Sequence, residues 1–439
     1  MSDGPRLPER PPFAIRARVL TPLAAGGHRY EADGLLRVAE DGRISEVRAW
    51  GTRDEASSVI DLRPWLLLPG MVDLHAHLPQ LPNAGVGAGL DLLTWLERYI
   101  FPLERAFDLE VAQRLAPAAF AAMAAAGTTT IVAYGALWEE SLDACFRAAE
   151  AHGIRAVIGK VMMDRLTYDE GIDPDEILRR SLAQSNALCE RWHGRDDGRL
   201  AYAYTPRFAV SCTREMLAAS AQAAARAGAF WQSHLAEDRN EITEVRQLFP
   251  EAADYTDVYA RAGALGPRSI LAHAVHLAHV EIARLVETRA VVAHCPASNL
   301  FLASGSMPLA KYLAAGVRVG LGTDIAAGPE LSLFSVMRAG AATQNALRVR
   351  GDEHPVLEPL DWLRMGTLAG AEALGWSDRI GSLEPGKEAD LIAVDPRMTA
   401  PLPGIDSHDP AEIMSRCIFR PHPEMVRAAW VRGKRLPAS

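Results

Sequence analysis

The sequence predicts an α/β protein in which a (β/α)₈, TIM-like barrel is joined to a small β-sandwich formed by both chain ends. Three observations support this fold. The chain has 439 residues, which is enough for one large barrel and a smaller domain. Through its middle, short β-branched or apolar runs alternate with longer helical patterns, as expected for a parallel sheet. Short strands separated by turn residues occupy the two ends.

Both ends of the chain have the alternating pattern of half-buried strands. Near the N-terminus the runs are 14–20 and 34–39, with turn residues at Gly26 and Gly27 and at Asp41 and Gly42. The pattern resumes at residues 381–395 and 425–435, as strands around turns at Pro385 and Gly386 and at Gly433. We therefore expect residues 1–68 and 377–439 to form the two parts of the β-sandwich and residues 69–376 to form the barrel.

The middle of the chain contains eight candidate barrel strands, the number that a closed barrel needs. They are residues 70–75, 129–133, 155–162, 200–205, 230–234, 269–273, 290–293 and 317–323. The segments between them, such as 109–126 and 214–227, are rich in Ala, Leu, Arg and Glu at helical spacing.

Composition excludes several classes of partner. Hydrophobic residues make up 49% of the chain and charged residues 23%, which is typical of a folded globular protein. A net charge of -9 repels phosphate backbones and anionic lipid headgroups, so we expect neither a nucleic-acid nor a membrane partner. The most apolar stretch, 116–137, contains a Gly-Thr-Thr-Thr turn and is better explained as a helix followed by a strand than as a membrane span.

The cysteines and the N-terminal sequence predict a cytoplasmic protein. Five widely spaced cysteines without a C-x-x-C pair support neither a disulfide framework nor a thiolate zinc site. The first residues, MSDGPRLPERPP, are polar and proline-rich and lack the basic-then-apolar order of a signal peptide.

Histidines follow the predicted strands in the pattern of a metal site. His75 and His77 are two residues apart on the first barrel strand, so both side chains point to the same side. His234, His273 and Asp324 fall at the ends of the fifth, sixth and eighth strands, the face on which barrel enzymes carry their active sites. Such a donor set suits one divalent ion, most simply Zn²⁺ with Fe²⁺ as the alternative, and leaves a position for water.

Glu237, three residues after His234, is the candidate proton-transfer group. A metal-activated water becomes a useful nucleophile only if a neighbouring group takes and redistributes its protons. The structural alternative is a carboxylate that stabilises a helix start, because Glu237, Asp238 and Glu241 form an acidic cluster. The end of the fourth strand, Thr205-Pro206-Arg207-Phe208, has no lysine that would bridge two ions, which favours a single-metal site.

Longer motifs resemble those of a known family. They include PGMVDLHAHLPQ from Pro69, TWLERYIFPLERAF from Thr94, GKVMMDR from Gly159, TPRF from Thr205, QSHLAE from Gln232, AHCPASNL from Ala293 and GLGTD from Gly320. Over most of its length the chain is similar to the amidohydrolase superfamily, and within it to the guanine deaminases.

The resemblance implies a role for each site residue. His75, His77, His234 and Asp324 would be metal ligands, and His273 would lie against the activated water or the substrate. Glu237 would shuttle protons to the ring nitrogen and the departing ammonia, while Asp324 would also accept a proton. Gln80 and Arg207 would hydrogen-bond the purine edge and Phe208 would pack on its face. The structural alternatives are a capping amide for Gln80 and a loop salt bridge for Arg207.

The implied reaction is hydrolytic deamination of guanine to xanthine and ammonia. Two segments, 325–329 and 419–423 (Phe419 to Pro423), depart from the family's usual pattern, and both are candidates for the pocket lining. Other aminated rings, namely 8-oxoguanine, a pterin or a triazine such as ammeline, therefore remain alternatives. A catalytically inactive barrel used as a scaffold is a further alternative, disfavoured by the complete ligand set. The resemblance also suggests a homodimer and a role in purine catabolism.

Overall fold

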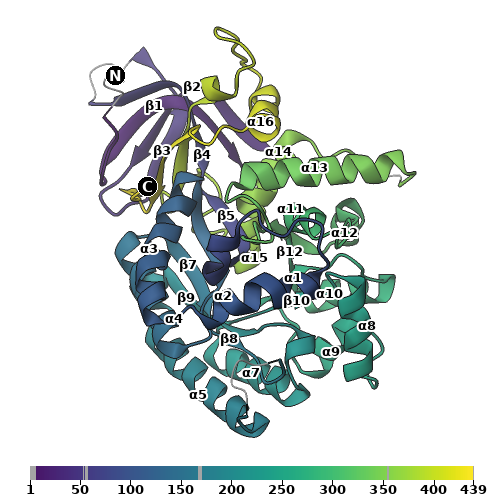
Figure 1. Cartoon of the computed structure of the whole chain (residues 1–439). Helices are drawn as coiled ribbons and strands as arrows, with labels where there is room; N and C mark the ends of the chain where they lie inside the picture. The colour runs from purple at the N-terminus through teal and green to yellow at the C-terminus, as the bar shows by residue number, and fades with distance from the viewer. Residues whose placement is uncertain (1–5, 53, 55–57, 167–170, 353–354, 439) are drawn as a thin grey trace.

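The computed structural model describes residues 6–52, 54, 58–166, 171–352 and 355–438. Figure 1 shows a barrel surrounded by helices and, beside it, a β-sheet domain that carries both termini. This arrangement confirms the predicted fold class.

Eight parallel strands form the barrel, and each overlaps one of the predicted runs. In hydrogen-bonded order they are β13 (Arg318–Leu321), β12 (Val291–His294), β11 (Ser269–His273), β10 (Phe230–Leu235), β9 (Leu200–Pro206), β7 (Arg155–Gly159), β6 (Thr128–Tyr134) and β5 (Met71–His77), with the short β8 (Val161–Met162) also paired to β9. Nearly every strand residue is buried, because helices cover the outside and side chains fill the inside.

The barrel closes between β13 and β5 through residues that lie next to the candidate site. The Asp324 N–H donates to the carbonyl of His75 at 2.7 Å, and the His77 N–H donates to the carbonyl of Ile325 at 3.1 Å. The buried carboxylate of Asp73 accepts from the backbone N–H of Thr323 at 3.0 Å and from its hydroxyl at 2.5 Å. The first and last strands are thereby fixed in register.

The main helices around the barrel are α3 (Leu109–Ala125), α4 (Glu139–His152), α5 (Pro174–Trp192), α7 (Arg214–Ala227), α8 (Arg239–Leu248), α9 (Tyr255–Arg261), α10 (His279–Thr288), α11 (Pro296–Phe301), α12 (Leu309–Ala315), α13 (Leu333–Val349), α14 (Pro359–Gly366) and α15 (Leu368–Leu374). Local signals set their ends. Helix α7, for example, begins after Thr213, whose side chain accepts from the Met216 N–H, and ends at Gly228 with φ +62°. The predicted helices 109–126 and 214–227 are both present.

A chain of short elements follows β5 and covers the mouth of the barrel. It consists of η2 (Leu78–Asn83), α1 (Leu92–Trp95), η3 (Leu96–Ile100) and α2 (Phe101–Arg105). Asp91 caps this stretch by accepting from the Thr94 N–H. Leu92, Trp95 and Leu96 are buried, so the segment adds an apolar wall above the strand ends.

The second domain is a seven-stranded sheet to which both ends contribute. Its order is β16 (Lys434–Arg435), β15 (Val426–Val431), β14 (Leu391–Val394), β4 (Ile60–Pro69), β1 (Phe13–Pro22), β2 (His28–Val38) and β3 (Ile44–Ala49). The sheet curls back on itself, because the Ile44 N–H donates to Lys387 O and the Ala389 N–H donates to Gly42 O. Helix α16 (Pro410–Phe419) packs on α13 and α14.

The strands predicted within 381–395, around a turn at Pro385 and Gly386, are present only after the turn. The turn itself is present, with Gly386 at φ +92°, and strand β14 follows it from Leu391. Residues 381–384, before the turn, form no strand. The turn places the side chains of Glu388 and Asp390 against the barrel.

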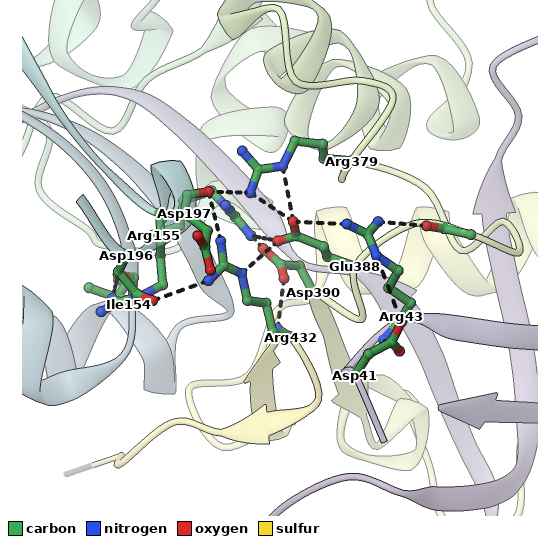
Figure 2. Close-up of polar contacts among 12 residues, drawn as sticks. Asp41, Arg43, Ile154, Arg155, Asp196, Asp197, Arg379, Glu388, Asp390 and Arg432 are labelled. Carbon is green, nitrogen blue, oxygen red and sulfur yellow. Dashed lines mark hydrogen bonds and ion pairs between the residues drawn. The ribbon is translucent and has the colours of Figure 1, made fainter. Parts of the chain in front are cut away.

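A buried ion-pair cluster joins the barrel to the sheet domain (Figure 2). Arg155, at the start of β7, donates to Glu388 at 2.5 Å and to Asp390 at 3.0 Å. Arg432 and Arg379 also donate to Glu388, at 2.9 and 2.7 Å. Burial would raise the pKa of Glu388, but the surrounding arginines lower it to about 2. The carboxylate is therefore ionised at neutral pH and attracts arginines from both domains.

We expect Arg155→Ala to destabilise the protein by about 3 kcal/mol, because it leaves buried carboxylates without their barrel partner. The thermal unfolding midpoint should fall by several degrees. Arg261→Ala is the matched control, since Arg261 forms an exposed ion pair with Asp257 within one helix, a type worth about 0.5 kcal/mol or less. Equal shifts for the two variants would contradict a joining role for the cluster.

Candidate functional site

The predicted site residues converge at the carboxyl ends of the barrel strands. His75 and His77 end β5, His234 lies near the end of β10, and His273 ends β11. Asp324 follows β13, and Glu237 follows β10. All of these side chains are buried.

Four donor atoms have the spacing of ligands around one ion. The Nε2 atoms of His75 and His77 are 3.2 Å apart, as are those of His77 and His234. Asp324 Oδ1 lies 3.2 Å from His75 Nε2 and 3.3 Å from His77 Nε2. Tetrahedral ligands about 2.0–2.1 Å from a common centre lie roughly 3.3 Å apart. The residues present therefore fit a divalent metal ion.

Burial keeps the imidazoles in the neutral form that binds metals. It lowers the pKa of His77 to about 4 and lowers the pKa of His234 well below its ordinary value. His234 Nδ1 lies 2.7 Å from the carbonyl oxygen of Arg207, to which it donates, so its Nε2 presents a lone pair. Burial would raise the pKa of Asp324, but His75 and His77 beside it hold that pKa well below the usual range. Neutral nitrogens with one carboxylate suit zinc or ferrous iron.

Glu237 and His273 face each other beside the four donors. Glu237 Oε2 lies 3.3 Å from His273 Nε2, and Oε1 accepts from the Ser304 hydroxyl at 3.2 Å. Burial, with the nearby charges of Asp324 and Glu241, raises the pKa of Glu237 well above its ordinary value. A carboxyl group with a raised pKa can hold a proton near neutral pH.

The backbone around these residues is held in an unfavourable conformation. His273, Ala274, Asp324 and Ala236 all have φ between +46° and +72°, a region that residues with a side chain seldom adopt. Backbone hydrogen bonds maintain it, including Ala274 N–H to Leu235 O at 2.8 Å. Positive φ values at several neighbouring strand ends are typical of functional sites.

A cavity of about 350 Å³, part of which is open to solvent, lies over the donor atoms. Gln80, Arg207 and Phe208 line it together with His77, His234, Glu237 and Asp324, and the apolar wall comes from Leu92, Trp95, Leu96, Leu302 and Ala327. All three predicted substrate-side residues thus lie in the same cavity as the donor set. Its mixed lining, apolar with a few converging polar groups, suits a small flat ligand.

Glu104 is a buried residue of the site that sequence reasoning missed. Arg207 Nη1 donates to both Glu104 oxygens, at 2.6 and 2.5 Å, and Gln80 Nε2 donates to Oε1 at 2.9 Å. Arg207 therefore does take part in a salt bridge, as one alternative interpretation held, and it also lines the cavity. Glu104 lies inside a quoted motif, but nothing in its spacing indicates a contact with a residue 103 positions away.

Three further residues were not singled out from the sequence. The Ser298 hydroxyl donates to Asp324 Oδ2 at 2.5 Å, and Asn299 Oδ1 accepts from His273 Nδ1 at 2.9 Å. Ser304 is the third, through its bond to Glu237. Ser298 and Asn299 belong to the sequence PASN, which follows the end of β12. Their position after a barrel strand was the signal in the sequence that could have identified them.

The two segments that depart from the family's pattern, 325–329 and 419–423, lie in different parts of the structure. Ala327, from 325–329, lines the cavity. The other candidate segment, 419–423, is not part of this lining, because Pro421, His422 and Pro423 border a different hollow, next to α13. Phe419 is 45% exposed, since α16 ends there on the outer side of the molecule.

Comparison with known proteins agrees with this geometry. The model of the amidohydrolase family matches residues 66–436. The chain belongs to the amidohydrolase family. Two curated relatives of this amidohydrolase are a probable guanine deaminase of Deinococcus radiodurans, 39% identical and covering 87% of each chain, and a guanine deaminase of Escherichia coli K12, 37% identical over 85% of this chain and 84% of the relative.

A solved structure is similar over nearly the whole amidohydrolase chain. It is a guanine deaminase from C. acetobutylicum with guanine bound in its active site, which has a TM-score of 0.89 and 27% sequence identity, with 97% of this chain and 99% of that one covered. Among the residues described here, this amidohydrolase has no helix that is both long and apolar enough to cross a membrane.

Proposed function

We propose that this amidohydrolase converts guanine and water to xanthine and ammonia. The observation that carries the proposal is one cavity that holds both a metal-type donor set and the paired polar groups of Arg207 and Gln80. The guanine deaminase relatives, which match at up to 39% identity, support the choice of substrate.

His75, His77, His234 and Asp324 would hold one divalent ion, zinc or ferrous iron. The ion would supply the Lewis acidity that makes water nucleophilic near neutral pH. Asn299 supports the arrangement by fixing the orientation of His273, and Ser298 does the same for Asp324. The strand-four end offers Arg207 in place of a bridging lysine, which supports a single-metal centre.

Glu237 would carry protons between the attacking water, the ring nitrogen and the leaving ammonia. Its raised pKa supports this role, because a general acid must still hold its proton at the working pH. His273 Nε2 lies 3.3 Å from Glu237 Oε2 and 3.8 Å from Asp324 Oδ2. From this position His273 would orient the attacking water or the substrate ring.

Arg207, Gln80 and Phe208 would place the ring. An arginine is well suited to donate to the O6 and N7 acceptors of guanine, and an amide oxygen can accept from the ring N1–H. Phe208, whose ring centroid lies 6.4 Å from that of His234, would contact the flat face. Together these contacts would bring C2, which carries the amino group, to the donor set.

We also propose that the enzyme is cytoplasmic and would act in purine catabolism on a free base. All five cysteines are unpaired and buried, which supports a reducing compartment.

Purified protein should contain about one zinc or iron per chain, as measured by elemental analysis. His75→Ala should lose most of that metal, because one of four donors is removed. His279→Ala, which alters an exposed histidine, is the control and should retain it. Two tightly bound ions per chain would rule out the single-metal centre.

Glu237→Gln should keep its metal but lose kcat by a factor of about 10² to 10⁴, because the amide is nearly isosteric yet cannot relay protons. Glu244→Gln, on the following helix α8, is the matched control and should be fully active. Near-normal turnover of Glu237→Gln would show that another group carries the proton.

A panel of aminated rings assayed for ammonia release should give the highest kcat/KM with guanine. Arg207→Ala should reduce kcat/KM for guanine by at least about 100-fold without changing metal content, since a site built to hydrogen-bond a ring loses heavily when one partner is removed. If guanine is inert while 8-oxoguanine, a pterin or ammeline reacts, the substrate assignment is wrong. If no ring releases ammonia from metal-loaded protein, the deaminase assignment is wrong.

A further inference from the structure

Glu104 lies behind the polar wall of the cavity and contacts both groups that would bind the ring. It comes from α2, whereas Gln80 belongs to η2 and Arg207 follows β9. Glu104 and Arg207 are each 2% exposed and Gln80 is 1% exposed. One carboxylate thus links two substrate-side residues that are far apart in the sequence, and all three are shielded from bulk water.

Stability is a weak explanation for this ion pair. Taking two charges out of water costs several kcal/mol each in effective terms, and well-packed apolar residues of similar volume often stabilise a protein as much or more. A carboxylate and a guanidinium buried beside a ligand cavity are therefore better explained by what they do to the ligand.

The charge of Arg207 has a strong effect inside such a cavity. In a medium of low effective dielectric, an uncompensated guanidinium attracts a negatively charged ring far more than it does in water. Guanine is neutral at physiological pH, while many related oxopurines ionise more readily. A pocket with an uncompensated positive charge on its polar wall would therefore retain anions, including ionised product.

We propose that Glu104 is a specificity-determining positioning residue: its carboxylate cancels the charge of Arg207 inside the cavity, so that the pocket selects neutral purines over anionic ones. The inference rests on the proposed function for its substrate, and it concerns a residue to which that function assigns no role. Glu104 acts on the ring indirectly, through its hydrogen bonds with Arg207 and Gln80.

The hydrogen bonds of Glu104 also set the pattern that the ring meets. The Gln80 amide nitrogen donates a hydrogen bond to Glu104. This bond fixes the orientation of the Gln80 amide and leaves its oxygen as the atom that would accept from a ring N–H. Arg207 keeps its hydrogen-bonding strength as a donor because its charge is balanced, not removed. Burial would raise the pKa of Glu104, but Arg207 holds it below the ordinary value, so the balancing charge is present.

The decisive variant is Glu104→Gln, which is nearly isosteric and can still accept a hydrogen bond from Arg207. The probe is urate, an oxopurine that is a monoanion at neutral pH and has no amino group to lose. We expect kcat/KM for guanine to fall about tenfold or more and urate to bind about tenfold or more tightly than to the unaltered enzyme, a change of about 1.4 kcal/mol for each factor of ten.

Opposite changes for the two ligands separate a charge effect from a structural one. If Glu104 only supports the fold of the cavity, the substitution weakens both ligands, and weaker or unchanged urate binding overturns the proposal. Glu251→Gln is the matched control, because it removes a carboxylate from an exposed ion pair with Arg214. It should change neither guanine turnover nor urate binding.

Two more variants test the charge directly. The double variant Glu104→Gln with Arg207→Gln removes both charges, and it should lose the gain in urate affinity; retention of the gain would overturn the proposal. Arg207→Gln alone leaves Glu104 uncompensated, so it should weaken urate more than hypoxanthine, a neutral purine. The ratio of urate affinity to hypoxanthine affinity in Arg207→Gln remains a test even if Glu104→Gln does not fold.

Urate and hypoxanthine binding, measured by calorimetry on metal-loaded protein, does not require turnover. An unaltered enzyme that fails to deaminate guanine would refute the proposed function, whereas the sign of the urate change would still decide the role of Glu104.

Discussion

Closure of the barrel between β13 and β5 is the constraint on which the rest of the site depends. The Asp324 N–H binds His75 O at 2.7 Å, so the carboxylate from the last strand is carried to within 3.3 Å of both histidines of the first. Asp73 strengthens the closure by binding Thr323, one residue before Asp324. Because closed strands cannot slide without breaking these bonds, the donor spacing follows from the barrel itself.

Burial then determines the charge of each group at the site. It keeps His77 and His234 neutral, raises the pKa of Glu237, and makes any unbalanced charge costly. Each permanent charge accordingly has a partner in the structure: Asp324 is bound by Ser298 and lies against His75, and Arg207 is bound by Glu104. In the proposed function, reaction chemistry and ring recognition would use separate groups that line the same cavity.

Features of the site that depend on local sequence patterns could be predicted, and features that depend on contacts between distant residues could not. Alternating and helical periodicities are local, so all eight barrel strands could be predicted, and the histidines could be placed because each ends a strand. Glu104 could not be paired with Arg207, since a contact across 103 residues depends on how the segment after β5 crosses the barrel mouth. The turn at Pro385 and Gly386 could be predicted from local sequence, whereas the pairing of Glu388 and Asp390 with Arg155 on the barrel could not, because it is a tertiary contact that local pattern does not reveal.

The metal-type donors and the residues that form the rest of the cavity come from different parts of the chain. The donors come from the rigid strand ends, whereas Gln80, Glu104 and the apolar residues Leu92, Trp95 and Leu96 come from the segment that follows β5. Substitutions in that segment can change the shape and charge of the ring site without moving a donor atom, because the donors are fixed by the barrel closure. If the cavity binds guanine as proposed, this segment and Arg207 would select the ring, and the balanced Arg207–Glu104 pair would favour a neutral, hydrogen-bonding purine.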